Sequence, residues 1–155
     1  LVSDWSSDVC SSDLQHLNRY ALNRPLDITW IGGGDHTLEQ KLRTENVDVT
    51  GMLPRDEVVK KLKGSDLYLH TAAWEGMPLT ILEAAKLHLP MVIRTIGATK
   101  DLNYPFLALT PEEMAKQIAH CVNHYDEIDF CQYTTALNDA FSEEKQRLAL
   151  NNIYG

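Results

Sequence analysis

The run at residues 70–90, HTAAWEGMPLTILEAAKLHLP, limits what this chain of 155 residues can fold into more than any other part of it. The apolar residues at 67–70 that lead into it are compact enough for a short buried strand. Small residues and a glycine then turn the chain, and Pro78 stands where a first helical position is expected. The pattern predicts a strand, a turn and a helix, with Glu75 in the turn and Glu83 about one and a half turns into the helix.

The predicted turn combines groups that suit a phosphorylated ligand. Backbone N–H groups from Leu79 onward have no partner within the helix, so they can bind an anion such as a phosphate. The two carboxylates beside them can accept hydrogen bonds from hydroxyl groups. A nucleotide sugar carries both hydroxyls and phosphates, and it is the ligand class that this turn favours.

Strands and helices are predicted to alternate along the rest of the chain. This alternation predicts an α/β fold, a Rossmann-like parallel sheet with helices on both faces and ligands at the carboxyl ends of its strands. Helix ends are marked by Thr37 and Gly64, and most clearly by Thr110 with Pro111 and Glu113. The expected strands are 27–31, 47–50, 67–70, 91–93 and 106–109, and the expected helices are 15–23, 38–43, 54–63, 78–87, 111–125 and 142–153.

Five motifs resemble, in order, the C-terminal donor-binding domain of retaining GT-B glycosyltransferases of the glycosyl transferases group 1, or family 4, type. The segment 75–83 matches their E-x7-E motif in its EG-x-P form, and 32–34 follows a strand as their G-x-G turn does. The other matches are the strand region 47–53, the segment 65–67 and the segment 90–101. Order and spacing agree over residues 27–109, which is far more specific than the two glutamates alone.

The resemblance implies a role for each residue of the central motif. Glu75 would be the catalytic residue that hydrogen-bonds hydroxyls of the transferred sugar, and Glu83 would bind the ribose hydroxyls. The donor sugar and its phosphates would lie against the segment between them, where glycine allows close approach of the backbone and the helix start offers N–H groups. That segment consists of Gly76, Met77, Pro78, Leu79 and Thr80.

Two other turns would complete the donor site by the same resemblance. Met52 and Leu53 would line the nucleobase pocket with main-chain groups, and Gly32 and Gly33 would shape the turn near the donor. No metal and no cofactor is implied, because the nucleotide-diphosphate sugar is a substrate.

The implied reaction is transfer of the sugar, with retention of configuration, to a glycan or a lipid-linked acceptor. The implied location is the cytoplasm, with peripheral association of the full-length protein at the inner face of the membrane. Two other functions stay open at this stage: a non-catalytic nucleotide-sugar-binding domain, and a nucleotide-sugar epimerase of GT-B fold.

Residues 4–14, DWSSDVCSSDL, resemble one reading frame of a sequencing adapter, although a Ser/Asp-rich tail would have the same composition. We therefore divide the chain into a non-native segment, 1–14, and a donor-binding domain, 15–155. The expected domain is truncated at its start. It would lack its first strand, the Arg/Lys pair that holds the leaving diphosphate, and the acceptor-binding N-terminal domain, so we expect the fragment alone to be inactive.

Composition excludes several classes of function. Lys and Arg number 14 against 22 Asp and Glu, and no basic stripe exists to bind nucleic acid. No run of 18 apolar residues is present, so no membrane span is predicted. With Cys10 set aside, Cys121 and Cys131 give no disulfide framework, which fits a reducing compartment.

Several residues invite competing interpretations. Gly32 and Gly34 begin a dinucleotide-binding pattern, but Thr37 stands at its third glycine and Asp48 lies within its strand, which argues against NAD. Trp74 is expected to pack the turn rather than stack on a base.

Three histidines need separate treatment. His120 and His124 have a spacing that metal sites use, but they are expected to lie on the solvent face of their helix. His70 ends the buried strand. A contact with a ligand and a hydrogen-bonded position at the edge of the core fit it about equally well. His88 replaces the glycine that the family has in a left-handed turn.

Overall fold

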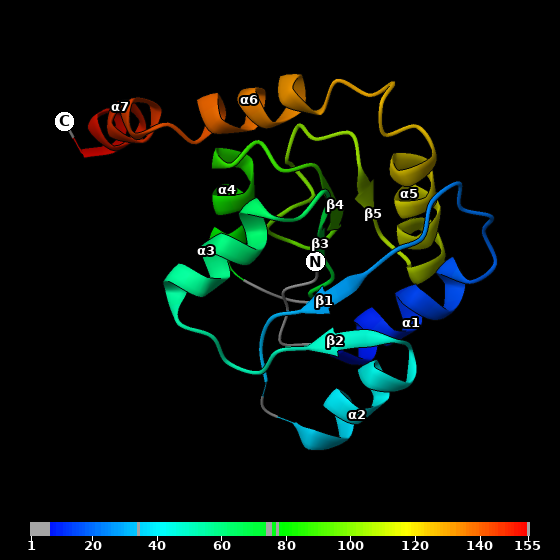
Figure 1. Cartoon of the computed structure of the whole chain (residues 1–155). Helices are drawn as coiled ribbons and strands as arrows, with labels where there is room; N and C mark the ends of the chain where they lie inside the picture. Colours follow the sequence, from blue (N-terminus) through cyan, green and yellow to red (C-terminus); the bar gives the residue numbers. More distant parts are fainter. Residues whose placement is uncertain (1–6, 34, 74–75, 77, 155) are drawn as a thin grey trace.

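The computed structural model describes residues 7–33, 35–73, 76 and 78–154 of the chain. Helices and strands alternate through most of the sequence, as predicted (Figure 1). In chain order the elements are α1 (Ser7–Leu17), β1 (Ile28–Trp30), α2 (His36–Thr44), β2 (Val47–Val49), α3 (Arg55–Lys63), β3 (Tyr68–His70), α4 (Leu79–Lys86), β4 (Met91–Arg94), β5 (Leu107–Ala108), α5 (Pro111–Asn123), α6 (Phe130–Ala140) and α7 (Glu143–Tyr154).

All the strand pairs of the described residues are parallel. They form two groups, β1–β2 and β3–β4–β5, with Ile28 opposite Val47 and Tyr68 opposite Met91. Figure 1 shows α4 and α5 on either side of the group that contains β4. The predicted α/β architecture with a parallel sheet is confirmed.

Strand β4 lies at the centre of the core. Its residues Met91, Val92 and Ile93 are fully buried, which is typical of a parallel strand covered on both faces. The continuous apolar run that predicted this strand is therefore the sequence signature of its position.

The predicted capping box at the start of α5 is present. The Glu113 backbone N–H donates to Thr110 Oγ1 at 3.2 Å, and the Thr110 backbone N–H donates to Glu113 Oε2 at 3.3 Å. The other two predicted ends differ in detail. Asp35, not Thr37, caps α2, because its side chain accepts from the Thr37 N–H at 2.8 Å. Gly64 does end α3, but with φ −91°, which any residue can adopt.

Replacement of Thr110 by alanine is expected to lower the free energy of unfolding by about 1 kcal/mol, since it removes the acceptor of one helix N–H group. Urea unfolding of the chain measures this. Thr135→Ala, at an exposed position within α6, is the matched control and is expected to change stability by less than about 0.5 kcal/mol. Equal effects of the two substitutions would contradict the capping role.

Two helices differ from the sequence prediction. The first helix ends at Leu17 rather than at residue 23, because the chain then runs to the end of α5. There the Asn23 backbone N–H donates to Asn123 Oδ1 at 2.8 Å, and the Asn23 side-chain amide donates to the Asn123 carbonyl at 2.9 Å. Helix α6 was not predicted, although Asp129 caps it by accepting from the Gln132 N–H at 3.1 Å.

Helix α1 continues through residue 14, where we divided the chain. Leu14 and Leu17 are buried in the core, and the Asp13 carboxylate forms a buried ion pair with Arg94 at the end of β4. Segment 4–14 therefore has a structural part in this chain, while its origin as an adapter stays a prediction.

His88 follows α4 with a left-handed backbone, φ +54°, as predicted for this turn. Its imidazole Nδ1 lies 3.2 Å from Thr134 Oγ1 on α6. The turn is therefore stabilised by a contact that glycine could not make.

Candidate donor-binding site

The turns after β1 and β2 meet at the carboxyl ends of these strands. The Gly32 N–H donates to the Gly51 carbonyl at 3.1 Å, and the two residues form an isolated bridge. Both have positive φ, +145° and +72°, in a region that side chains disfavour. The structure thus joins the predicted turn near the donor to the start of the predicted nucleobase pocket.

Gly33 is required by close packing of the same turns. A Cβ atom there would lie 3.2 Å from Gly51 Cα and 3.0 Å from Glu39 Oε1. Beyond Gly51, Met52 has 72 % of its surface exposed and Leu53 is half-buried. Because Met52 is so exposed, this loop has main-chain and side-chain surface available for a ligand.

Helix α4 begins at the place where the sequence predicts an anion site. Pro78 has an extended backbone, φ −73° and ψ 109°, so it is the N-cap of α4. The prediction that Pro78 is the first helical residue is therefore wrong by one position. The first turn holds no acidic residue, which leaves the positive end of the helix dipole unopposed by its own side chains. The Leu79 side chain is 69 % exposed. This helix start can therefore accept an anion.

A hydrogen-bonded chain anchors α4 on β3. Tyr68 donates its hydroxyl to Thr80 Oγ1 at 2.9 Å, and His70 Nδ1 lies 3.4 Å from the same Tyr68 oxygen. Since the hydroxyl proton points to Thr80, His70 Nδ1–H is placed to donate to Tyr68. Burial, with a smaller contribution from the nearby Arg94, lowers the pKa of His70 to about 4, so its ring is neutral near pH 7.

Glu83 lies beside the predicted nucleobase loop. Its Oε1 is 2.7 Å from Nη2 of Arg55, the first residue of α3, and its side chain keeps 25 % of its surface exposed. Arg55 follows Met52 and Leu53 by three and two positions. The structure therefore brings together two parts of the site that are separated in sequence.

Other predicted site residues lie outside the described residues. These are Glu75 and Met77, and the same holds for Trp74 and Gly34. Gly76 is described and exposed, and an added Cβ would meet no atom within 4 Å. Among the described residues, no close contact requires glycine at position 76.

The two helix histidines face solvent, as predicted. Their ring centroids are 4.9 Å apart, and His124 Nδ1 pairs with Glu127 at 3.0 Å. In the described part of the chain, no three His, Cys, Asp or Glu side chains converge as a metal site would require.

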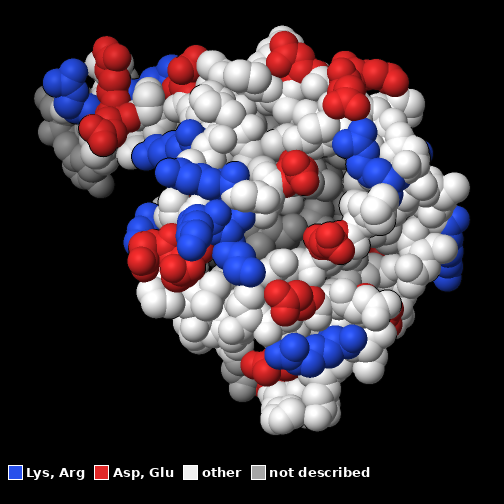
Figure 2. Space-filling view, in the orientation of Figure 1, with Lys and Arg blue, Asp and Glu red and all other residues white. Residues whose placement is uncertain are grey.

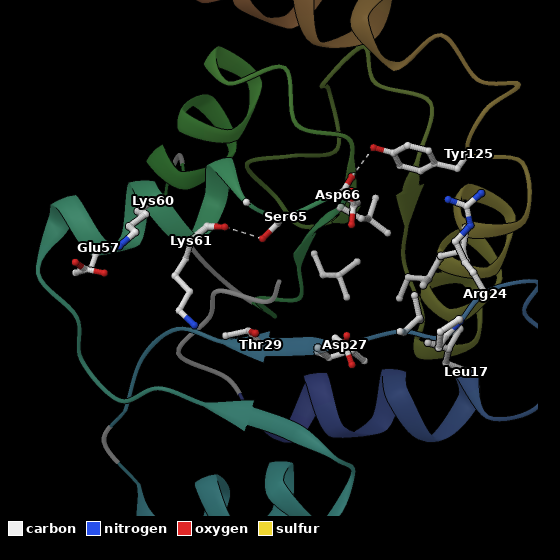
Figure 3. Close-up of a pocket in the computed structure, with 18 residues that line it drawn as sticks. Leu17, Arg24, Asp27, Thr29, Glu57, Lys60, Lys61, Ser65, Asp66 and Tyr125 are labelled. Carbon is white, nitrogen blue, oxygen red and sulfur yellow. Dashed lines mark hydrogen bonds between the residues drawn. The ribbon is translucent and has the colours of Figure 1, made fainter.

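A cavity of about 620 Å³ lies away from the predicted site (Figure 3). It opens where Asp27 leads into β1 and where Ser65 and Asp66 lead into β3, at the amino-terminal ends of these strands. Ligands of parallel α/β sheets bind at the carboxyl ends. Strand polarity therefore argues against this cavity as the predicted donor site.

Charge on the visible face is uneven. Figure 2 shows Lys and Arg side chains gathered over α3, whose last turn holds Lys60, Lys61 and Lys63. Separately, none of the helices within the described ranges has the length and apolar character needed to cross a bilayer.

Two curated relatives of this chain are named as glycosyltransferases. Curated relatives include the protein named "Putative teichuronic acid biosynthesis glycosyltransferase TuaC" from Bacillus subtilis, 27 % identical over 95 residues, which are 60 % of this chain and 24 % of that protein. A second is "UDP-Gal:alpha-D-GlcNAc-diphosphoundecaprenol alpha-1,3-galactosyltransferase" from Escherichia coli, 40 % identical over 48 residues, which are 31 % of this chain and 12 % of that protein. This chain thus spans a quarter or less of these relatives.

Solved structures show the fold. The structure of TarM superposes with a TM-score of 0.74 at 16 % identity, and a mutant of O-GlcNAc transferase from Thermobaculum terrenum with 0.66 at 16 %. Each match covers 99 % of this chain and 35 % of the other. The fold is therefore that of part of a GT-B glycosyltransferase. The sequence profile described as "Glycosyl transferases group 1" matches residues 11–124, most of the chain, and the chain belongs to this family.

Proposed function

We propose that this chain is the donor-binding part of a retaining glycosyltransferase that takes its sugar from a nucleoside-diphosphate sugar. The observation that supports the proposal is the ion pair between Glu83 and Arg55, a residue that follows Met52 and Leu53 by three and two positions. In a nucleotide the ribose is bonded directly to the base. Groups that bind these two parts must therefore lie close together, and the ion pair links Glu83 to the helix that directly follows the predicted nucleobase loop.

The phosphates would continue from this point to the start of α4. Breaking the bond between the anomeric carbon and the diphosphate develops negative charge on the leaving phosphate, and preorganised donors aimed there supply the largest catalytic stabilisation in many enzymes. The N–H groups of Leu79 and Thr80 would serve this role, and the Tyr68 hydrogen bond holds Thr80 in place. Glu75 would bind the sugar hydroxyls, and Gly76 would let the backbone approach them.

Transfer, rather than binding alone or epimerisation, is supported by both curated relatives, which are named as glycosyltransferases. The name of the Escherichia coli relative includes a diphosphoundecaprenol-linked sugar, which favours a glycan or lipid-linked acceptor here. Such an acceptor would place the full-length protein in the cytoplasm, in peripheral contact with the inner face of the membrane. We expect the acceptor site, and the cations for the leaving diphosphate, to come from outside these 155 residues, and the chain alone to bind donor without transferring sugar.

Replacement of Glu83 by glutamine is expected to weaken nucleoside-diphosphate binding by about 10-fold or more, because a hydrogen bond to a charged group contributes about 1.5–3 kcal/mol. Calorimetric titration of the 155-residue chain with UDP, GDP and ADP measures this.

The matched control is Glu144→Gln, which removes an exposed carboxylate from α7 and is expected to leave binding unchanged. A chain that binds none of the three nucleotides, or a Glu83→Gln variant with wild-type affinity, would contradict the proposed donor site.

A further inference from the structure

Arg55 contacts the predicted ribose-binding residue from a different strand–helix unit. It begins α3, which follows β2, whereas Glu83 lies in α4, which follows β3, and the two charged atoms are 2.7 Å apart. The Arg55 side chain is 78 % exposed and that of Glu83 is 25 % exposed. A carboxylate has about four acceptor positions on its two oxygens, so Glu83 can accept from Arg55 and still accept from a ligand.

The position of Arg55 is unfavourable for its own helix. A cation in the first turn of a helix opposes the macrodipole, and the next two residues, Asp56 and Glu57, have the sign that the dipole favours. An ion pair whose cation is 78 % exposed adds little to stability. Arg55 thus opposes the dipole of its helix without a large gain in stability, and such a residue is expected where function requires it.

We propose that Arg55 is a positioning residue that holds the Glu83 carboxylate in the orientation needed to accept hydrogen bonds from vicinal ribose hydroxyls. This inference rests on the proposed function, and it concerns the selection of ribonucleotide over deoxyribonucleotide donors. Without Arg55, the Glu83 side chain would populate several rotamers, and the site would discriminate less between ribose and deoxyribose.

The planar, forked guanidinium fixes a carboxylate better than an ammonium group can. Arg55→Lys should therefore keep the charge but restore discrimination only in part. Arg55→Met keeps much of the length and removes the charge, and it should fold normally because the pair is exposed. Lys60→Met, also on α3 and exposed, removes an equal charge that does not pair with Glu83, so it reports the general effect of charge.

The test compares dissociation constants of UDP, GDP and ADP with those of their 2′-deoxy forms, measured by calorimetry on the 155-residue chain and its variants. The wild-type chain is expected to prefer the ribose form of the nucleotide it binds by about 10-fold, the value of one hydrogen bond to a charged group. Arg55→Met is expected to reduce this ratio to about 2-fold or less on the same basis, while Lys60→Met preserves it.

Other outcomes overturn the inference. If Arg55→Met lost the same affinity for the ribose and the deoxyribose form, Arg55 would act only as a general attractive charge. If the ratio of the two dissociation constants did not change, Arg55 would have no part in the selection of ribose. Tighter binding of the ribonucleotide by Arg55→Met would show that Arg55 competes with the ligand for Glu83. A wild-type chain with no preference for ribose would overturn the proposed role of Glu83 as well. A wild-type preference that survives Arg55→Met overturns only the inference about Arg55.

Discussion

Replacement of Arg94 by methionine is expected to lower the free energy of unfolding by about 3–5 kcal/mol, the usual cost of leaving one member of a buried ion pair alone. The Arg94 and Asp13 side chains have only 5 % and 1 % of their surface exposed, so solvent cannot replace the lost partner. Arg94 Nη1 also donates to the Leu109 carbonyl at 3.1 Å. Urea unfolding measured for the variant and the parent chain gives the difference.

A double substitution separates the energetic contribution of the ion pair from that of side-chain packing. Arg94→Met combined with Asp13→Asn leaves no buried charge, so it is expected to be less destabilised than Arg94→Met alone. Lys100→Met, an exposed position shortly after β4, should change stability by less than about 0.5 kcal/mol. If Arg94→Met lost no more stability than Lys100→Met, the ion pair would have no structural importance.

Acidification is expected to destabilise the chain through His70. Burial lowers the pKa of His70 from 6.5 to about 4, whereas the unfolded chain has the ordinary value. Between these values the unfolded state binds a proton that the folded state does not, so stability falls as the pH drops from about 6.5 to about 4. Above 6.5 this penalty is absent. The loss over the window is on the order of 3 kcal/mol, since one pKa unit corresponds to about 1.4 kcal/mol.

The contribution of His70 is obtained by difference, because carboxylates also titrate in this range. His70→Gln should flatten the dependence of unfolding free energy on pH between 6.5 and 4, whereas His36→Gln, at an exposed position, should preserve it. Unfolding curves at pH 7, 5.5 and 4 for the three proteins make the comparison. A His70→Gln variant with the parent's slope would show that His70 is protonated in the folded state.

Local patterns predicted much of the fold. The capping box at Thr110 needs only residues within one helical turn, and the apolar run at Met91 needs only its neighbours to show a buried strand. The left-handed turn at His88 was expected from the family resemblance and not from local pattern, and His88 keeps it with φ +54°. Helix α6 carried usable signals as well, since Asp129 is a good cap and Phe130, Thr134 and Leu137 have helical spacing and are buried.

The candidate site was predicted less completely. Gly32 and Gly33 were identified as turn residues from the sequence, but the reasons they must be glycine are tertiary. Gly32 has φ +145° and its added Cβ would lie 3.3 Å from Trp30, and a Cβ on Gly33 would lie 3.2 Å from Gly51 Cα in the next strand–helix unit. Arg55 was not identified at all. Its neighbours in sequence form an ordinary helix start, and nothing in that segment indicates which carboxylate it will meet.

The sequence by itself determined the alternation of strands and helices through α5 and the parallel arrangement of the strands, because these follow from residue spacing over short segments. Tertiary structure alone decided that Arg55 meets Glu83, that Tyr68 holds Thr80, and that Asp13 is buried against Arg94, 81 residues away. Such pairs form only after the strands have paired and the helices have packed. Their physical cause is the arrangement of the whole chain in space, which no local pattern of residues contains.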